Sequence, residues 1–368
     1  MRICVPSETA PRERRVALVP DSVAKLVKGG HEVVVQAGAG AGAYHDDAQY
    51  EAAGATIAPS AAAAHAGAQV VCRVQRPSAE EVALIPEGAV LVSLMAPASA
   101  GPVVETLTAR RVTALALELV PRITRAQSMD VLSSQATVAG YKAVLVGASL
   151  LPRFLPMLTT AAGSITPAKV FVIGAGVAGL QALATARRLG GVTSGFDVRA
   201  AAAEQVKSLG AAFVASDVVS AGAEDRGGYA KAQSEDEAAR TLATIARHIK
   251  DQDLVITTAA IPGKPAPRLV TAEMVATMRP GSVIVDLAAE TGGNCALTRA
   301  GETVEAHGVQ VVGAVNLPAT MPTHASQMFS RNVLTLLQHL AKEGTPVIDL
   351  ADEITGAMTL THDGQGRR

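Results

Sequence analysis

The segment KVFVIGAGVAGLQALATARRLGGVTSGFDVRA, residues 169–200, has the residue types and the spacing that bind a dinucleotide. An apolar run leads directly into Gly174, Gly176 and Gly179, and a helical pattern begins at once. In this arrangement the glycines allow a tight turn, a close approach of a pyrophosphate and close helix–strand packing, while the helix N-terminus offers N–H groups to the anion. We therefore predict a dinucleotide site here.

An aspartate at the end of the next predicted strand favours NAD(H) over NADP(H). Asp197 lies 18 residues after Gly179, where a carboxylate can accept hydrogen bonds from both hydroxyls of the adenosine ribose. The same carboxylate repels a 2′-phosphate. Arg199 follows two residues later and weakens this preference, since an arginine can bind that phosphate.

Two further loops leave predicted strands toward the same crevice. They are ITTAAIPGKPAP, residues 256–267, and VDLAAETGGNC, residues 285–295. In open α/β sheets ligands bind beyond the carboxyl ends of the strands, so these loops are candidate walls of the site; the alternative is that they are ordinary turns. The candidate cofactor-binding residues are Gly174, Gly176, Val177, Ala178, Gly179, Asp197, Val198, Arg199, Thr258, Ala259, Glu290 and Asn316.

A second glycine-rich segment, QAGAGAGAYHDD at residues 36–47, also matches G-x-G-x-x-A from Gly38. Its helical pattern starts late, near Asp46, and no acid follows at the required distance. We interpret this segment as a turn.

Polar residues are crowded in PRITRAQSMDVLSSQ, residues 121–135. The segment holds two arginines, two glutamines, one aspartate and three serines on a thin apolar frame. Such a segment is either the solvated start of a surface helix or a loop that holds a polar ligand by many hydrogen bonds. Composition and spacing leave both alternatives open.

Strand-like and helix-like runs alternate along almost the whole chain, which predicts right-handed βαβ units. We predict an α/β protein with two doubly wound, parallel-sheet, Rossmann-like domains. The first comprises residues 1–136 and 318–368, because the last strong helical pattern, residues 324–344, is expected to pack back onto it. The second comprises residues 137–317, and mixed helical periodicity over 137–166 links the two.

Composition excludes several other classes. The chain has 368 residues, a formal net charge of −1 and 2% aromatic residues, so neither nucleic-acid binding nor attraction to an anionic membrane is expected. The most apolar long window, residues 143–163, contains Arg153 and two prolines and predicts no membrane insertion. Cys4, Cys72 and Cys295 form no CxxC pair, and no metal constellation is evident. Among the scattered histidines, His324 is a weak candidate near the crevice.

Longer segments carry a family resemblance. RICVPSETAPRERRVALVP, HEVVVQAGAGAGAYHDDAQYEAAGA, GKPAP, MRPGSVIVDLAAETGGNC and VNLPATMP together resemble the alanine dehydrogenase and pyridine nucleotide transhydrogenase (PNT) family. The resemblance covers nearly the whole chain, and the two branches of the family perform different chemistry.

The residues expected of an amino-acid dehydrogenase are missing. Alanine dehydrogenases use a lysine and a histidine for substrate binding and acid–base work; at the corresponding positions RVQRP gives Gln75 and LVSLMAPAS gives Ala96. Arg15 is retained. Neither Gln75 nor Ala96 can carry a proton near neutral pH, so this activity is disfavoured.

The polar segment instead resembles the signature loop of the NAD(H)-binding component of proton-translocating transhydrogenases. The resemblance implies that Arg122, Asp130 and Ser133 hydrogen-bond the nicotinamide carboxamide. Gln127 would reach the nicotinamide ribose and the second nucleotide. Tyr229, within a glycine-punctuated insertion over residues 216–239, would belong to a mobile loop that closes over NAD(H).

The resemblance also implies a reaction and a setting. Direct hydride transfer between two nicotinamides needs alignment and no general acid or base. NADP(H) would be held by a partner subunit, a transmembrane subunit would couple transfer to proton translocation, and this chain would be a homodimer at the cytoplasmic face of the inner membrane. A chain ending without a spanning helix fits a separate subunit or a truncated one. Two alternatives stay open: a stand-alone amino-acid dehydrogenase, and a non-catalytic NAD sensor.

Overall fold

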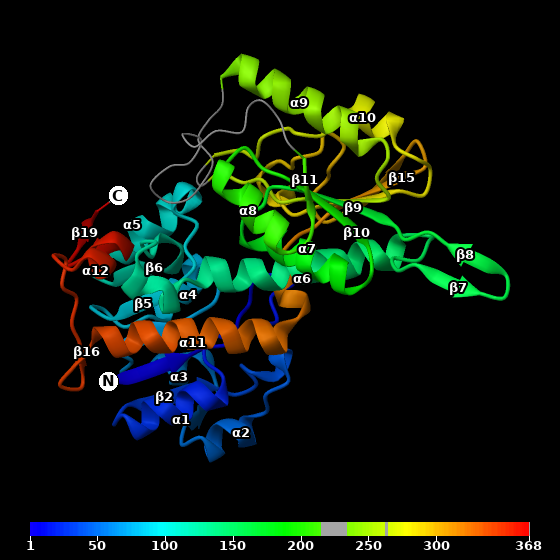
Figure 1. The fold of residues 1–368 in the computed structure, drawn as a ribbon. Coiled ribbons are helices and arrows are strands. Elements are labelled where there is room, and N and C mark those ends of the chain that lie inside the picture. Colours follow the sequence, from blue (N-terminus) through cyan, green and yellow to red (C-terminus); the bar gives the residue numbers. More distant parts are fainter. Residues whose placement is uncertain (215–233, 262–263, 368) are drawn as a thin grey trace. The chain divides into compact units, whose positions relative to one another are not determined.

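The computed structural model describes residues 1–214, 234–261 and 264–367 (Figure 1). Contacts divide the chain into two compact units, Met1–Gln135 with Pro318–Arg368 and Ala136–Leu317. Each unit contains a mostly parallel sheet covered by helices. The predicted domains, as parts that fold independently, stay a prediction.

The sheet of the first unit has the strand order β19-β18-β6-β5-β4-β1-β2-β3. Its six parallel strands follow the order 3-2-1-4-5-6 of doubly wound dinucleotide folds, in which a ligand crevice forms where the order reverses, here between β1 and β4. The strands are β1 (Arg2–Val5), β2 (Glu32–Gln36), β3 (Thr56–Ala58), β4 (Val70–Cys72), β5 (Val90–Ser93), β6 (Thr113–Ala116), β18 (Thr359–His362) and β19 (Gln365–Gly366).

Both faces of this sheet are buried. Along β2, Val33 and Val35 join one hydrophobic cluster while Val34 joins another, because successive side chains of a strand point to opposite faces. This explains the nearly continuous apolar strands of the sequence. The covering helices are α1 (Pro20–Lys28), α2 (Asp47–Ala52), α3 (Ala61–His65), α4 (Ala79–Leu84), α5 (Gly101–Ala109), α11 (Pro322–Leu340) and α12 (Glu353–Met358).

Helix α11 returns the chain to the first unit. Phe329, Val333, Leu336 and Leu340 recur at helical spacing and are buried in the same cluster as Val33 and its neighbours. The discontinuous first part of the fold, predicted from the sequence, is confirmed.

The sheet of the second unit repeats the same order, β11-β10-β9-β12-β13-β15, with β14 added at one edge. Its switch point lies between β9 and β12. The strands are β9 (Lys169–Ile173), β10 (Val192–Phe196), β11 (Ala212–Phe213), β12 (Leu254–Thr257), β13 (Val283–Asp286), β14 (Thr303–Ala306) and β15 (Val309–Gly313). Its helices include α7 (Val177–Arg188), α8 (Ala200–Ser208), α9 (Glu235–Ile249) and α10 (Ala272–Thr277).

The α/β class is confirmed, but two details of the prediction were wrong. The sheets are not wholly parallel, because β14, β18 and β19 pair antiparallel at the edges. The supposed linker over 137–166 is instead the long helix α6 (Val131–Leu150), followed by a hairpin of β7 (Leu158–Thr160) and β8 (Gly163–Ile165). After Gly38 the α-helix begins only at Asp47, as expected for a turn.

Candidate functional site

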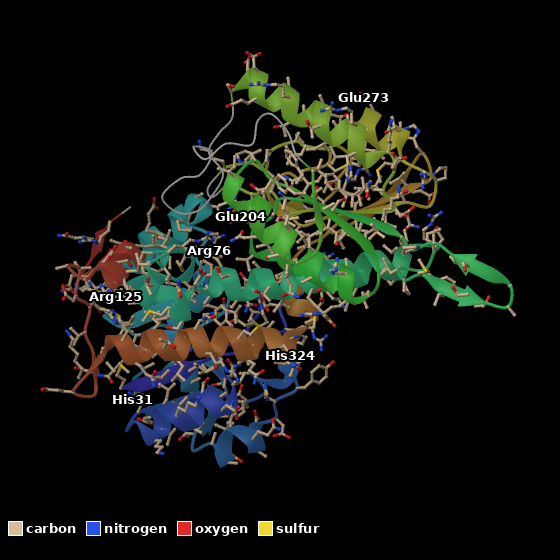
Figure 2. The ribbon with its side chains drawn as sticks, viewed as in Figure 1. His31, Arg76, Arg125, Glu204, Glu273 and His324 are labelled. Atoms are coloured by element: carbon tan, nitrogen blue, oxygen red, sulfur yellow. The ribbon has the colours of Figure 1, made fainter. Side chains whose placement is uncertain are left out.

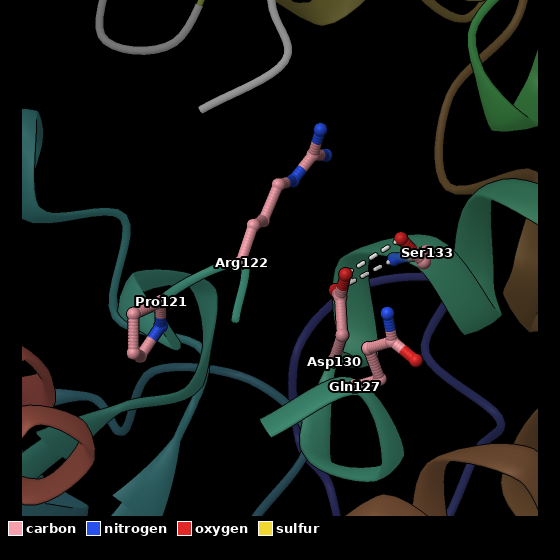
Figure 3. Close-up of a pocket in the computed structure, with 5 residues that line it drawn as sticks. All are labelled: Pro121, Arg122, Gln127, Asp130 and Ser133. Carbon is pink, nitrogen blue, oxygen red and sulfur yellow. Dashed lines mark hydrogen bonds between the residues drawn. The ribbon is translucent and has the colours of Figure 1, made fainter. Parts of the chain in front are cut away.

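The polar segment of the first unit surrounds a cavity of about 310 Å³. Pro121, Arg122, Gln127, Asp130 and Ser133 line it (Figure 3). Four of these are the residues predicted to hold the nicotinamide, and the structure brings them together. Ala126, Met129 and Val131 between them are buried in the core, so the apolar frame anchors the segment and leaves its polar side chains at the cavity.

Asp130 also forms the start of α6. Its carboxylate accepts hydrogen bonds from the Ser133 backbone N–H at 2.9 Å and the Ser133 hydroxyl at 2.6 Å (Figure 3). This is the geometry of a helix N-cap, in which a side-chain oxygen satisfies an otherwise unpaired N–H group. The two alternatives for this segment are therefore combined, since one pair of side chains both begins the helix and lines the cavity.

The positions at which alanine dehydrogenases carry their proton-transfer residues are occupied differently. The Gln75 amide donates to Glu13 Oε2 at 2.8 Å, and Glu13 is paired with Arg15 at 2.8 Å. Ala96 has a left-handed backbone (φ 48°), and its N–H donates to the Glu118 carboxylate. Neither side chain can carry a proton, and Arg15 is engaged by a buried carboxylate.

A further carboxyl group lies behind this network. Glu8 accepts hydrogen bonds from the N–H groups of Val74 at 2.6 Å and Gln75 at 3.2 Å, and lies 3.7 Å from Arg73. Burial raises the pKa of Glu8 to about 7, outweighing the opposing effects of Arg73 and the two N–H groups. Glu8 therefore titrates near neutrality, but it is not one of the residues that line the cavity.

The glycine-rich turn of the second unit fits a bound pyrophosphate. Gly174 has φ 96°, and a Cβ there would lie 2.7 Å from the Thr258 hydroxyl; a Cβ at Gly179 would lie 1.8 Å from the Gly174 carbonyl. A Cβ at Gly176, by contrast, would meet nothing within 4 Å. Gly174 and Gly179 thus close the turn, and Gly176, the N-cap of α7, leaves open space where an anion can approach the backbone.

Asp197 is tied to this turn and to Arg199. Its carboxylate accepts from the Ala175 N–H at 2.8 Å, and from Arg199 Nε at 2.9 Å and Nη2 at 2.8 Å. Asp197 is only 6% exposed. Arg199 therefore lies on the carboxylate, which offsets the concern that it would serve a 2′-phosphate.

The other candidate residues gather at the carboxyl ends of the central strands. The Thr258 hydroxyl donates to the Gly174 carbonyl at 2.8 Å, and the Asn316 N–H donates to Glu290 at 3.3 Å. Val177 and Ala178 begin α7, and Val198 lies between Asp197 and α8. Tyr229 lies outside the described residues, as does most of its insertion.

Two residues of this unit were missed. Asn294 is fully buried, accepts from the Ala259 N–H and donates to the carbonyls of Ala259 and Pro267, so it holds the loop after β12. Gly140, within α6, faces Ala178: a Cβ there would lie 2.0 Å from its carbonyl oxygen. An isolated glycine inside a helical pattern was the available signal for close packing at Gly140.

The remaining titratable groups support no further chemistry. His324 lies in the first turn of α11, at the end opposite the pairing of Asp352 with Arg125 and His339 (Figure 2). Burial raises the pKa of all three cysteine thiols, which are free. Among the described residues, no group of three or more His, Cys, Asp or Glu could hold a metal, and no helix is long and apolar enough to cross a membrane.

Comparison with known proteins identifies the family. Residues 4–139 match the model described as alanine dehydrogenase/PNT, N-terminal domain, and residues 143–368 match the corresponding C-terminal domain. The chain is 50% identical over 372 residues to the first of the polypeptides that make up NAD(P) transhydrogenase subunit alpha in Rhodospirillum rubrum, covering 99% of this chain and 97% of that protein.

Two other relatives set this match in context. A crystal structure of transhydrogenase from Sinorhizobium meliloti superposes with a TM-score of 0.91 at 46% identity, covering 100% of both chains. Alanine dehydrogenase of Mycolicibacterium smegmatis is 30% identical, over 99% of this chain and 94% of that protein. The chain belongs to the alanine dehydrogenase/PNT family, and it resembles these transhydrogenases more closely than this alanine dehydrogenase.

Proposed function

We propose that this chain binds NAD(H) and exchanges a hydride directly with NADP(H) held by a partner subunit. The observation that supports it most strongly is the replacement of proton carriers by a hydrogen-bonded amide and an alanine at Gln75 and Ala96, in a unit whose cavity is lined by the polar segment 121–133. A reaction between two nicotinamides requires orientation and exclusion of water, which hydrogen-bonding side chains supply without titrating.

Each residue has a proposed task. Gly176 and the N-terminus of α7 bind the pyrophosphate, and Asp197 binds the adenosine ribose. Asp130 and Ser133, already fixed to each other, orient the carboxamide together with Arg122, while Gln127 contacts the nicotinamide ribose. When bound, NAD(H) supplies the C4 hydride that is donated or accepted.

The relatives' names extend the proposal to partners. The name of the Rhodospirillum rubrum protein describes it as one portion of an alpha subunit, which means that further polypeptides complete that enzyme. We propose the same here: an NADP(H)-binding subunit receives the hydride, and a transmembrane subunit couples the transfer to proton translocation. The chain would then lie at the cytoplasmic face of the inner membrane through these partners.

Isotope transfer tests this function. NADH carrying deuterium at C4 is mixed with the chain, NADP⁺ and an NADP(H)-binding transhydrogenase subunit. We expect deuterium to appear in NADPH without exchange with water. Hydrogen from solvent in the product would contradict direct transfer. NADH oxidation with pyruvate and ammonia alone, at an enzymatic rate, would favour the amino-acid dehydrogenase instead.

A homodimer is the proposed state of the chain, and exposed apolar side chains of the second unit support it. Met157 is 64% exposed, Val192 53% and Ile165 44%, and the segment before β7 packs on the turn before β10, since a Cβ at Gly190 would meet Pro156 at 2.5 Å. Hairpin β7–β8 extends from the rest of its unit (Figure 1). Contiguous exposed apolar surface is typical of protein interfaces.

Charged substitutions in this surface are expected to separate the dimer. We expect Met157→Asp combined with Ile165→Asp to give a monomer by light scattering, because two carboxylates would have to be buried without partners. The matched control is Tyr44→Asp, which changes a 70% exposed aromatic residue of the first unit and should leave the mass unchanged. A dimeric double variant would contradict this interface.

A further inference from the structure

We propose that Gln135 is a positioning residue that sets the alignment of the loop bearing Gln127, Asp130 and Ser133. The inference rests on the proposed function, because it concerns how that loop presents a nicotinamide. Gln135 is 8% exposed and follows Ser133 within the first turns of α6. The cavity is lined by its neighbours, whereas the Gln135 side chain contacts the interior of the first unit.

Both ends of the Gln135 amide are used. Its Oε1 accepts from Arg15 Nη1 at 2.8 Å, and its Nε2 donates to the Ala325 carbonyl at 3.0 Å and the Ser134 hydroxyl at 3.3 Å. Arg15 lies between β1 and α1, and Ala325 lies in α11. One side chain therefore joins three segments that are distant in sequence, which fixes both the rotation and the height of the first turn of α6.

Arg15 is itself held rigidly. Glu13 pairs with it through Nη2 at 2.8 Å and through Nε at 2.9 Å, and their side chains are 0% and 3% exposed. Gln75 donates to the same carboxylate at 2.8 Å. A buried ion pair persists only in a well-satisfied geometry, so Arg15 is a fixed point against which Gln135 is placed.

The other end of the loop is attached to the same helix. The Asn332 amide, 8% exposed, donates to the Ser128 carbonyl at 2.7 Å, and Asn332 belongs to α11. Residues 128–135 are thus fastened to α11 near both ends. Loss of the Gln135 attachment should let Asp130 and Ser133 shift while the rest of the loop stays in place.

The test separates alignment from folding. Gln135→Met keeps the volume but removes both hydrogen-bonding functions. Because a misplacement of about 1 Å costs on the order of 100-fold in rate, we expect deuterium transfer from NADH to fall roughly 10- to 100-fold. The Kd for NADH, held mainly by the second unit, should change less than about 5-fold. Gln135→Glu, which keeps the acceptor for Arg15, should recover some of the rate.

A matched control removes a comparable buried polar group elsewhere in the first unit. Thr361 is fully buried, donates to the Val112 carbonyl at 2.7 Å and accepts from the Ala114 N–H at 3.0 Å. Thr361→Val should lower the unfolding temperature and leave the transfer rate unchanged. Should Gln135→Met not fold, Gln135→Asn, one methylene too short, is expected to show the same loss of rate.

Two outcomes would overturn the assignment. One is a Gln135 variant that unfolds at a lower temperature but transfers deuterium at the wild-type rate. The other is a parallel loss of rate in the Gln135 and Thr361 variants, which would indicate general destabilisation. A wild-type chain that transfers no deuterium to NADP⁺ overturns the proposed function itself, and this role with it; a loss confined to the Gln135 variants leaves that function intact.

Discussion

Replacement of Asp197 by asparagine is expected to weaken NADH binding by about 10- to 100-fold and to create binding of NADPH. Hydrogen bonds to a charged group contribute roughly 1.5–3 kcal/mol, which corresponds to that loss for the adenosine ribose. Asparagine keeps one oxygen for the Ala175 N–H, so the glycine-rich turn should survive. It carries no charge to repel a 2′-phosphate, and it no longer forms an ion pair with Arg199.

The gain of NADPH binding should depend on Arg199. Released from the carboxylate, its guanidinium can form charge-assisted hydrogen bonds to the 2′-phosphate. Titration of NADH and NADPH, followed by dihydronicotinamide fluorescence, measures both affinities. In the double variant Asp197→Asn with Arg199→Met, the gain should vanish while the loss for NADH remains. Unchanged preference for NADH in the single variant would refute the role of Asp197.

The second large effect is expected at a glycine that contacts no predicted ligand. In Gly140→Ala the new Cβ would lie 2.0 Å from the Ala178 carbonyl oxygen and 2.8 Å from its carbonyl carbon. Backbone atoms cannot rotate away as a side chain can, so the first turn of α7 must move. Overpacking costs about 1–3 kcal/mol and sometimes more; we expect the upper end of this range, with NADH affinity reduced at least about tenfold.

The same substitution elsewhere on α6 provides the control. In Gly147→Ala the new Cβ would lie 2.4 Å from Leu254 Cδ1, a side-chain atom that can change rotamer. Thermal unfolding and NADH titration should therefore show moderate destabilisation and nearly normal affinity. If Gly140→Ala binds NADH as tightly as Gly147→Ala, close packing on Ala178 has no role in shaping the nucleotide turn.

The sequence predicted those features of the site that depend on local patterns. The glycines of the turn were identifiable because each has its task within a short stretch of chain, and Arg122, Gln127, Asp130 and Ser133 because they resemble a known loop. The left-handed φ of Gly174 and the open space at Gly176 agree with the turn expected there.

What could not be predicted depends on contacts between distant residues or on side-chain conformation. The pairing of Arg199 with Asp197 is a choice of rotamer, which spacing does not reveal. Gln135 looks like any polar residue near a helix start until Arg15 and Ala325, at separations of 120 and 190 residues, are brought beside it. Strand β18 is four residues long, and it becomes a strand through pairing with β6.

The return of α11 and β18 to the first sheet also has a consequence for biosynthesis. The ribosome emits the chain from its N-terminus, so all of Ala136–Leu317 is made before the segments that complete the core around Val33 and pair with the β6 edge. Until then the nascent N-terminal region has an uncovered apolar face and an unpaired strand. The portion translated first is therefore the last to close, and it depends longest on protection from aggregation.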